Sequence, residues 1–215
     1  NNLELDQLFR RVDSSLNFIL SLDNILEFAL TISRIIDFRS HFTASHSFTV
    51  ANLAYEIGKI FGFSPERCLK LKISGYLHDL GKIAVDPGLI EKHGPLTEDE
   101  FDLVKLHTYY TEQILSSLSI SEWFNEIVTW AQNHHEKTDG SGYPYSLQDE
   151  SLDSGCKILA FSDVIAALME DRPYRKSLSI DTAFEIIKDK LAAKISPTMF
   201  EVIAQHKQEI STIVE

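Results

Sequence analysis

Apolar residues recur at three- and four-residue spacing along most of the chain, the pattern of helices that bury one face. One clear stripe near the start comprises Leu22, Ile25, Leu26, Ala29, Leu30, Ser33 and Ile36. No segment shows the strict alternation of a half-buried strand, and no internal repeat or low-complexity segment interrupts the pattern. The chain is therefore predicted to be an all-α helical bundle.

The first part of the chain reads as one or two helices. Residues 1–38 are mostly apolar and charged and contain neither Gly nor Pro. We expect this N-terminal helical segment to pack structurally, or to connect to an upstream domain, because the sequence starts without Met or a signal-peptide pattern. The main domain is expected over residues 39–215, in the cytoplasm and as part of a longer protein.

Helix starts are marked by capping residues. Ser64 precedes Pro65, and Ser196 precedes Pro197, so each serine is predicted to cap a helix whose first position is proline. Thr97 with Glu100 forms the pattern of a capping box at the start of a long helix. These boundaries place the candidate chemistry on separate helices.

Composition excludes two classes of partner. The net charge of −12 argues against binding duplex nucleic acid, which depends on Lys and Arg neutralising phosphates. No apolar run reaches the roughly 18 residues that a membrane span needs. A small anionic ligand stays compatible, because a bound cation can invert the local field. Cys68 and Cys156 lack metal-ligand spacing and fit a reducing compartment.

Histidines fall on predicted buried faces of several helices. His46 shares a face with Val50 and Leu53, and His107 lies on the stripe of the helix that Thr97 caps. A lone histidine on an apolar face is more often a hydrogen-bonded core histidine than a metal ligand. Histidines occur at two further places in the chain. His78 is followed directly by Asp79, and His134-His135 precede a glycine-rich loop.

Carboxylates in apolar surroundings strengthen the metal interpretation. Asp79 beside His78 would be costly in an apolar helix without a charged partner or a metal. Asp163 is the only charge between Ile158 and Ala167, and a buried lone carboxylate requires a cation. The set predicts a two-metal centre, in which ions about 3.5–4 Å apart hold a hydroxide and clamp a phosphoryl group. Nitrogen-rich ligation favours iron, manganese, zinc or nickel over magnesium or calcium.

Two long motifs resemble those of a known family. They are His78-Asp79-Leu80-Gly81-Lys82 and His134-His135-Glu136-Lys137-Thr138-Asp139-Gly140-Ser141-Gly142-Tyr143-Pro144. Together they resemble the HD-GYP family, a branch of the HD-domain metal phosphohydrolases, and the likeness extends from about residue 40 to about residue 206. It implies an HD-domain bundle with a buried metal centre, preceded by the N-terminal helices. It also implies hydrolysis of cyclic di-GMP to pGpG or GMP, with iron or manganese as the first-choice metals.

The resemblance also implies roles for individual residues. One metal would be held by His46, His78, Asp79 and Asp163, and the other by Asp79, His107, His134 and His135. Asp79 and Lys82 would be catalytic, with Lys82 stabilising the scissile phosphate or helping to protonate the leaving oxygen. Substrate would be bound by Lys82, Gly140, Gly142, Tyr143, Pro144, Arg172 and Arg175.

The chain departs from the family pattern at four positions. Phe42 stands where members with three metals carry a glutamate, so two metals are predicted here. Thr49, Thr111 and Ala166 replace the family's common Arg, Gly and Asp, which reduces the expected efficiency of turnover.

Three alternatives follow from the same residues. The site can hold a cyclic nucleotide with little turnover, or the glycine loop can dock a diguanylate cyclase or other signalling domain. An HD phosphohydrolase for another nucleotide fits the loop less well. Hybrid cyclic GMP-AMP fits as well as cyclic di-GMP.

Overall fold

The computed structural model describes residues 22–39, 45–92, 94–118, 122–171 and 175–214. Among these residues there are helices and no strand, which confirms the all-α prediction; an isolated bridge joins Asp139 and Gln148. The longer helices are α2 Leu22–Arg39, α3 His46–Ile60, α4 Pro65–Leu77, α6 Glu98–Ser117, α7 Asn125–Gln132, α8 Ser154–Met169, α9 Ile180–Lys190, α11 Pro197–Gln205 and α12 Lys207–Val214. The short ones are η1 Leu80–Ala84, α5 Pro87–Ile90, η2 Glu122–Phe124, η3 Asp149–Ser151 and α10 Ala192–Ile195.

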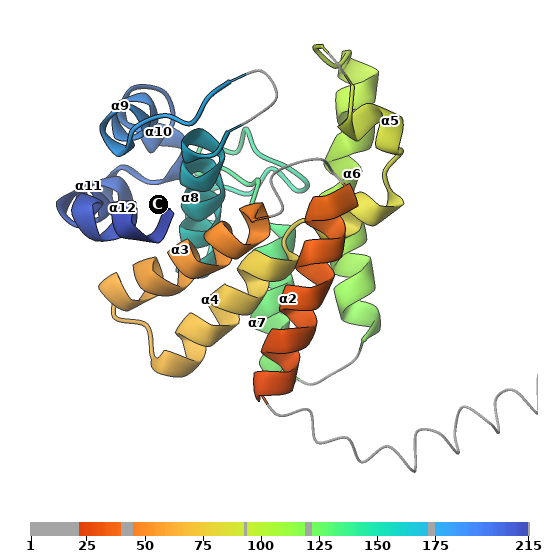
Figure 1. Ribbon diagram of the computed structural model, residues 1–215, viewed down its shortest axis with the longest axis horizontal. Helices are drawn as coiled ribbons and strands as arrows, with labels where there is room; N and C mark the ends of the chain where they lie inside the picture. The colour runs from red at the N-terminus through yellow and green to blue at the C-terminus, as the bar shows by residue number, and fades with distance from the viewer. Residues whose placement is uncertain (1–21, 40–44, 93, 119–121, 172–174, 215) are drawn as a thin grey trace, which may run out of the picture.

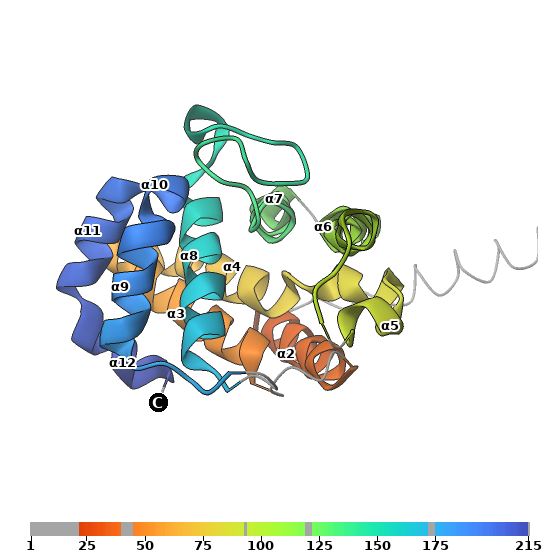
Figure 2. The same ribbon diagram turned by 90° about the horizontal axis from the view of Figure 1, so that it is seen from above.

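The hairpin of α3 and α4 forms one side of the bundle, and α8 packs across it (Figure 1). Gly62 makes the turn between α3 and α4 with a φ of 71°, a conformation that glycine adopts at little cost. Helices α9 to α12 lie on one side of α8, while α7 and α6 lie on the other (Figure 2). Helix α8 therefore runs through the middle of the molecule.

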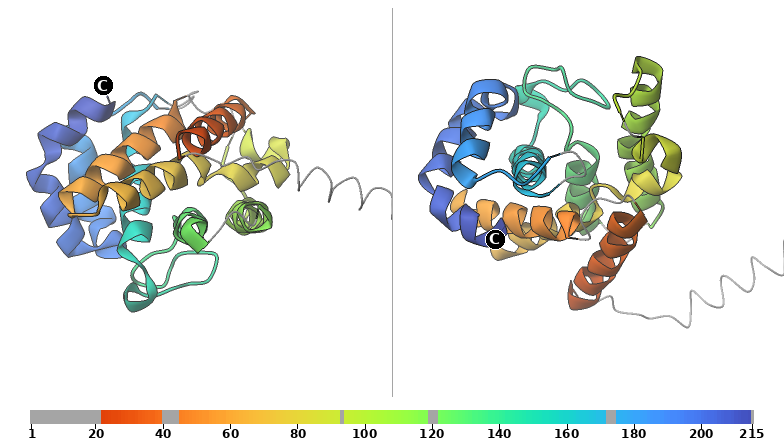
Figure 3. Two further views of the ribbon diagram at one scale, coloured as in Figure 1. Left: turned by 90° about the horizontal axis from the view of Figure 1, so that it is seen from below. Right: turned by 45° about the horizontal axis from the view of Figure 1, so that its top comes forward.

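Two hydrophobic clusters meet around this arrangement. The first joins α8 to the C-terminal helices, with Trp130, Phe161 and Ile203 among its buried members. The second joins α2, α4, α6 and α7, with Ile73 and Ile127 fully buried. Seen end-on, α8 lies between the C-terminal helices and α7, and the loop that follows α7 arches over them (Figure 3).

The predicted N-terminal stripe is confirmed on α2. Ile25, Ala29, Ser33 and Ile36 are all buried, and α2 packs on α4. The other helix predicted within residues 1–38 lies outside the described residues, and the domain boundary at residues 38 and 39 stays a prediction. Within the described residues, no helix combines the length and apolarity needed to cross a membrane.

The predicted caps also form. Ser64 accepts a hydrogen bond from the backbone N–H of Arg67, and Ser196 accepts one from Met199. Thr97 and Glu100 make both hydrogen bonds of the capping box at the start of α6. These caps fix where the helices begin, and so fix the rotational position of the histidine on α6.

Candidate metal centre

Three buried histidines are oriented by the same local contact. The Nδ1 atom of each lies 2.7 Å from the carbonyl oxygen three residues earlier, in the pairs His78–Gly75, His107–Val104 and His134–Ala131. A carbonyl oxygen only accepts, so each Nδ1 must donate its hydrogen. In the neutral ring the lone pair is then on Nε2, the atom that faces away from the helix and can bind a metal.

These Nε2 atoms lack hydrogen-bond partners. In the described part of the chain, Nε2 of His78, His107 and His134 is buried and makes no hydrogen bond, and neither does Oδ1 of Asp79. Buried polar atoms are almost always satisfied in native proteins, so four orphaned atoms in one place require an explanation. A bound metal ion supplies it, because all four are lone-pair donors.

Asp79 lies between two groups of donors. Its Oδ2 is 3.2 Å from Nε2 of His78, and its Oδ1 is 3.5 Å from Nε2 of His107. Ligands that share an ion at about 2.0–2.2 Å lie roughly 3–3.5 Å from each other. Each oxygen of Asp79 is thus at ligand spacing from a different histidine, the geometry that a bridging carboxylate needs.

The second carboxylate, Asp163, reaches the centre from the middle of α8. Its Oδ1 is 3.1 Å from Nε2 of His46 and 4.0 Å from Nε2 of His78, and its Oδ2 is 4.0 Å from Nδ1 of His135. The structure therefore brings together all seven residues predicted as metal ligands.

The donor atoms divide into two compact groups. One comprises His46, His78 and Asp79, the other comprises His107, His134 and His135, and within each group the ligand atoms lie within 4.8 Å of one another. The predicted assignment likewise divides these histidines between two ions, and it adds Asp163 to the first group and Asp79 to the second.

Burial sets the protonation of the second group. Burial lowers the pKa of His107 and His134, and it lowers the pKa of His135 to about 3. These rings are neutral at physiological pH and offer lone pairs directly. Burial would raise the pKa of Asp79, but His78 and Lys82 outweigh it and hold that pKa well below its usual value.

Lys82 and Gly81 follow the ligands on η1. The Nζ atom of Lys82 lies 2.5 Å from Oδ2 of Asp79. Lys82 lines an open cavity of about 420 Å³ together with four ligands and Arg175. That volume is within the range of about 300–1,000 Å³ typical of small-molecule sites.

The glycine loop covers the centre from the side of α7. The ring of Tyr143 lies 4.8 Å from the ring of His135, centroid to centroid. Gly140 has a φ of 75°, and a Cβ on Gly142 would lie 2.4 Å from the backbone nitrogen of Lys137, so both positions require glycine. Pro144 follows Tyr143 through a cis peptide bond.

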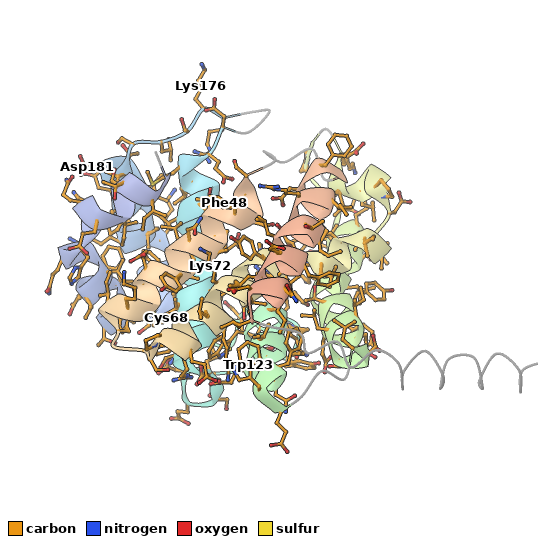
Figure 4. All side chains as sticks on the ribbon, turned by 60° about the horizontal axis from the view of Figure 1, so that its bottom comes forward. Phe48, Cys68, Lys72, Trp123, Lys176 and Asp181 are labelled. Carbon is orange, nitrogen blue, oxygen red and sulfur yellow. The ribbon has the colours of Figure 1, made fainter. Side chains whose placement is uncertain are left out.

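Arg175 lines the cavity, but its guanidinium is hydrogen-bonded to backbone carbonyl oxygens. Its Nη atoms donate to the carbonyl oxygens of Ala167, Leu168 and Lys176. These bonds use three of its five N–H donors. The neighbouring Lys176 side chain points outward at the edge of the molecule (Figure 4), and Arg172 lies outside the described residues.

Three important residues were not identified from the sequence in these roles. Glu136 is buried and accepts hydrogen bonds from Tyr145 N and Leu147 N. Thr111, noted as a family departure, accepts from Gly81 N and donates to His78 O. Glu170 lies 2.9 Å from His46; its spacing of seven from Asp163, two helical turns, could have indicated a shared face.

Comparison with known proteins agrees with this geometry. A family model described as HD domain matches residues 31–199. The 3'3'-cGAMP-specific phosphodiesterase 1 of Vibrio cholerae serotype O1 is 32% identical over 194 residues, covering 88% of this chain and 44% of that protein. The cyclic di-GMP phosphodiesterase of Thermotoga maritima is 30% identical over 193 residues, covering 89% of this chain and 52% of that protein. The chain thus spans about half the length of these relatives.

A solved structure shows the same fold. Bd1817, an HDG"Y"P protein from Bdellovibrio bacteriovorus, superposes with a TM-score of 0.62 over 91% of this chain and 67% of that chain, at 13% identity. These matches confirm the HD-GYP resemblance drawn from the two motifs. Because the family model covers well over half of the sequence, the chain belongs to the HD domain family.

Proposed function

We propose that this chain is a metal-dependent phosphodiesterase that hydrolyses a cyclic dinucleotide. Cyclic di-GMP is the first candidate substrate, giving pGpG or GMP, and 3'3'-cyclic GMP-AMP is the second. The observation that carries the proposal is the set of orphaned buried donor atoms of His78, His107, His134 and Asp79, which converge on one centre beside an open cavity.

The donor set supports two transition-metal ions. Five imidazoles with two carboxylates favour iron or manganese, with zinc or nickel as alternatives, over the oxygen-preferring magnesium and calcium. When bound, such ions polarise phosphoryl oxygens and lower the pKa of water toward neutrality. The neutral state of His107, His134 and His135 supports the same conclusion, because ligand imidazoles must be deprotonated.

The roles of the surrounding residues follow from their positions. Lys82 is a cation at the edge of the cavity, suited to a non-bridging phosphate oxygen or to protonating the leaving oxygen. Tyr143 presents a ring beside His135, where it can contact the nucleotide. Arg175 retains N–H donors for phosphate or guanine, although its anchoring to α8 limits how far it can move.

Two candidate substrates are proposed because relatives of this chain are named for both. Relatives named for cyclic di-GMP and for 3'3'-cGAMP both resemble this chain at similar identity. Both nucleotides contain guanine and the same ring of phosphodiesters. Parallel kinetics with the two nucleotides therefore decide the substrate.

The test uses the chain purified without oxygen and loaded with Fe(II) or Mn(II). Each nucleotide is incubated with the protein, and linear products are separated by chromatography. Loaded protein should release product, whereas Asp79→Asn and His135→Ala should not, with helical content unchanged. His206→Ala is the matched control, because His206 is paired with Glu209 at the surface, away from the centre. Tight binding of either nucleotide by loaded protein without any product would instead favour a binding module.

A further inference from the structure

His46 differs from the other buried histidines in how it is oriented. Helix α3 begins at His46, so no earlier turn of that helix can offer a carbonyl oxygen to its Nδ1. A carboxylate takes that place: Nδ1 of His46 lies 2.9 Å from Oε2 of Glu170, while Nε2 lies 3.1 Å from Asp163. The hydrogen-bond acceptor for Nδ1 of His46 is thus 124 positions away in sequence. For His78, His107 and His134 the acceptor is three residues away.

We propose that Glu170 is the positioning residue for His46, holding the Nδ1 hydrogen so that Nε2 faces Asp163 and the metal. The inference rests on the proposed metal centre and names a residue outside the predicted ligand set. A carboxylate can only accept, so without metal both ring nitrogens of His46 donate, Nδ1 to Glu170 and Nε2 to Asp163. A ring that binds a metal through Nε2 has lost that hydrogen and keeps the one on Nδ1, which Glu170 accepts. A carboxylate partner also makes the ligand nitrogen more basic than a carbonyl partner would.

Glu170 is itself held in place. It is the C-cap residue of α8, and its N–H donates to the carbonyl oxygen of Ala166 at 3.0 Å. Arg175 binds the neighbouring carbonyl oxygens of α8, so the chain beyond Glu170 folds back along the helix end. The Glu170 side chain is 11% exposed, and its second oxygen, Oε1, is buried without a hydrogen-bond partner in the described part of the chain. Among the described residues, the hydrogen bond that this carboxylate makes is the one to His46, so it is suited to orienting that ring.

The consequence is an asymmetry between the two metal positions. The group of His107, His134 and His135 does not depend on Glu170, since backbone carbonyls orient His107 and His134. Loss of Glu170 should therefore weaken only the position that includes His46. Changing such an outer partner typically costs about 10–100-fold in metal affinity.

The experiment measures Mn(II) bound by metal-stripped protein, by equilibrium dialysis with elemental analysis and by electron paramagnetic resonance. Wild type should bind two ions per chain with coupled-pair spectra. Glu170→Ala should weaken one site about 10–100-fold, giving one ion and an uncoupled spectrum at limiting Mn(II). Glu170→Gln keeps an acceptor oxygen, so it should weaken the same site less. Asp171→Asn is the matched control, because Asp171 is exposed and accepts from Ser177 N instead.

The outcomes separate the two proposals. If wild type binds no metal, the proposed metal centre fails whatever Glu170 does. If wild type and both Glu170 variants bind two ions with equal affinity and the same spectrum, the positioning role is wrong while the centre stands. Equal weakening of both sites would also overturn it, since a general loss of structure would act on both. Helical content and unfolding temperature, measured in chelator, show that each variant is folded.

Discussion

Gly81 lies directly against the backbone of His107: a Cβ built on Gly81 would be 1.9 Å from that residue's carbonyl oxygen. This close approach brings η1 onto α6, and it sets the distance between the ligands that precede Gly81 and the ligand on α6. The glycine of the first motif is therefore explained by packing between two segments that carry predicted metal ligands, rather than by turn geometry alone.

Replacing Gly81 by alanine should push α6 away from η1. The blocking atoms are backbone, so they cannot move aside as a flexible side chain would. We expect Gly81→Ala to lower the free energy of unfolding by about 2 kcal/mol or more, as overpacking of a tight core does, and to reduce the bound metal. Urea unfolding in chelator measures the first effect, and metal analysis the second.

The matched control is Gly88→Ala. Among the described residues, the neighbour that its Cβ would meet is a side-chain oxygen of Asp86 at 3.2 Å. Gly88 lies in α5 on the surface, so this variant should unfold within about 0.5 kcal/mol of wild type. Equal stability of both alanine variants would contradict the packing explanation.

Thr111 connects the same two segments by hydrogen bonds. Its Oγ1 accepts from Gly81 N at 2.9 Å and donates to His78 O at 3.1 Å, in a fully buried position. Thr111→Val keeps the shape but leaves both backbone groups unsatisfied, at about 1–3 kcal/mol for such a group. Chemical unfolding should show a loss of that size.

Thr108→Val provides the comparison for Thr111→Val. Thr108 is also fully buried, but its hydroxyl bonds the carbonyl oxygen of Lys105 within the same helix. Removing that bond does not break any contact between η1 and α6. The loss of unfolding free energy should therefore be smaller than for Thr111→Val. The reverse order of stabilities would show that Thr111 does not link η1 to α6.

Acid should destabilise the metal-free protein through its buried neutral histidines. Burial lowers the pKa of His107 and His134, and brings that of His135 to about 3, against about 6.5 in the unfolded chain. Below pH 6.5 the unfolded chain binds more protons than the folded one, so stability falls as pH falls. Each such ring contributes a slope of up to about 1.4 kcal/mol per pH unit.

Alkali should destabilise the same protein through His46. Burial opposes its charge, but the hydrogen bonds to Asp163 and Glu170 prevail and raise the pKa of His46 to about 10. Its contribution is complete below pH 6.5 and is lost as pH rises toward 10. Urea unfolding in chelator from pH 4 to 10 should therefore give maximal stability near pH 6.5. A flat profile above pH 7 would contradict the ion pairing of His46.

Much of this architecture was accessible from sequence because it rests on local patterns. The stripe of α2, the caps at Ser64 and Thr97, and the two motifs carrying His78 and His134 all follow from nearby residues. The structure adds contacts between segments distant in sequence, which no spacing rule encodes. Glu170 reaches His46 only because the end of α8 packs on the start of α3. Likewise, Thr111 makes two hydrogen bonds between segments. The family pattern indicated only that the common glycine is missing at this position.

The buried carboxylate of Glu136 should control the glycine loop rather than the metals. Its two oxygens accept from Tyr145 N at 2.6 Å and from Leu147 N at 3.0 Å, so it ties the end of the loop to the segment that directly follows His134 and His135. In Glu136→Gln one oxygen becomes an NH₂ group, which cannot accept and faces an N–H donor. We expect the loop and Tyr143 to lose order, which weakens nucleotide binding about fivefold for each 1 kcal/mol lost.

The measurement for Glu136→Gln is a split between KM and kcat for the nucleotide that the chain hydrolyses. KM should rise at least fivefold while bound metal and kcat change little, because the histidine anchors do not involve Glu136. Asp139→Asn is the control: Asp139 is exposed, and among the described residues its carboxylate accepts hydrogen bonds only from Ser141, so KM should stay near that of wild type. Loss of metal from Glu136→Gln would instead assign this carboxylate to the support of His134 and His135.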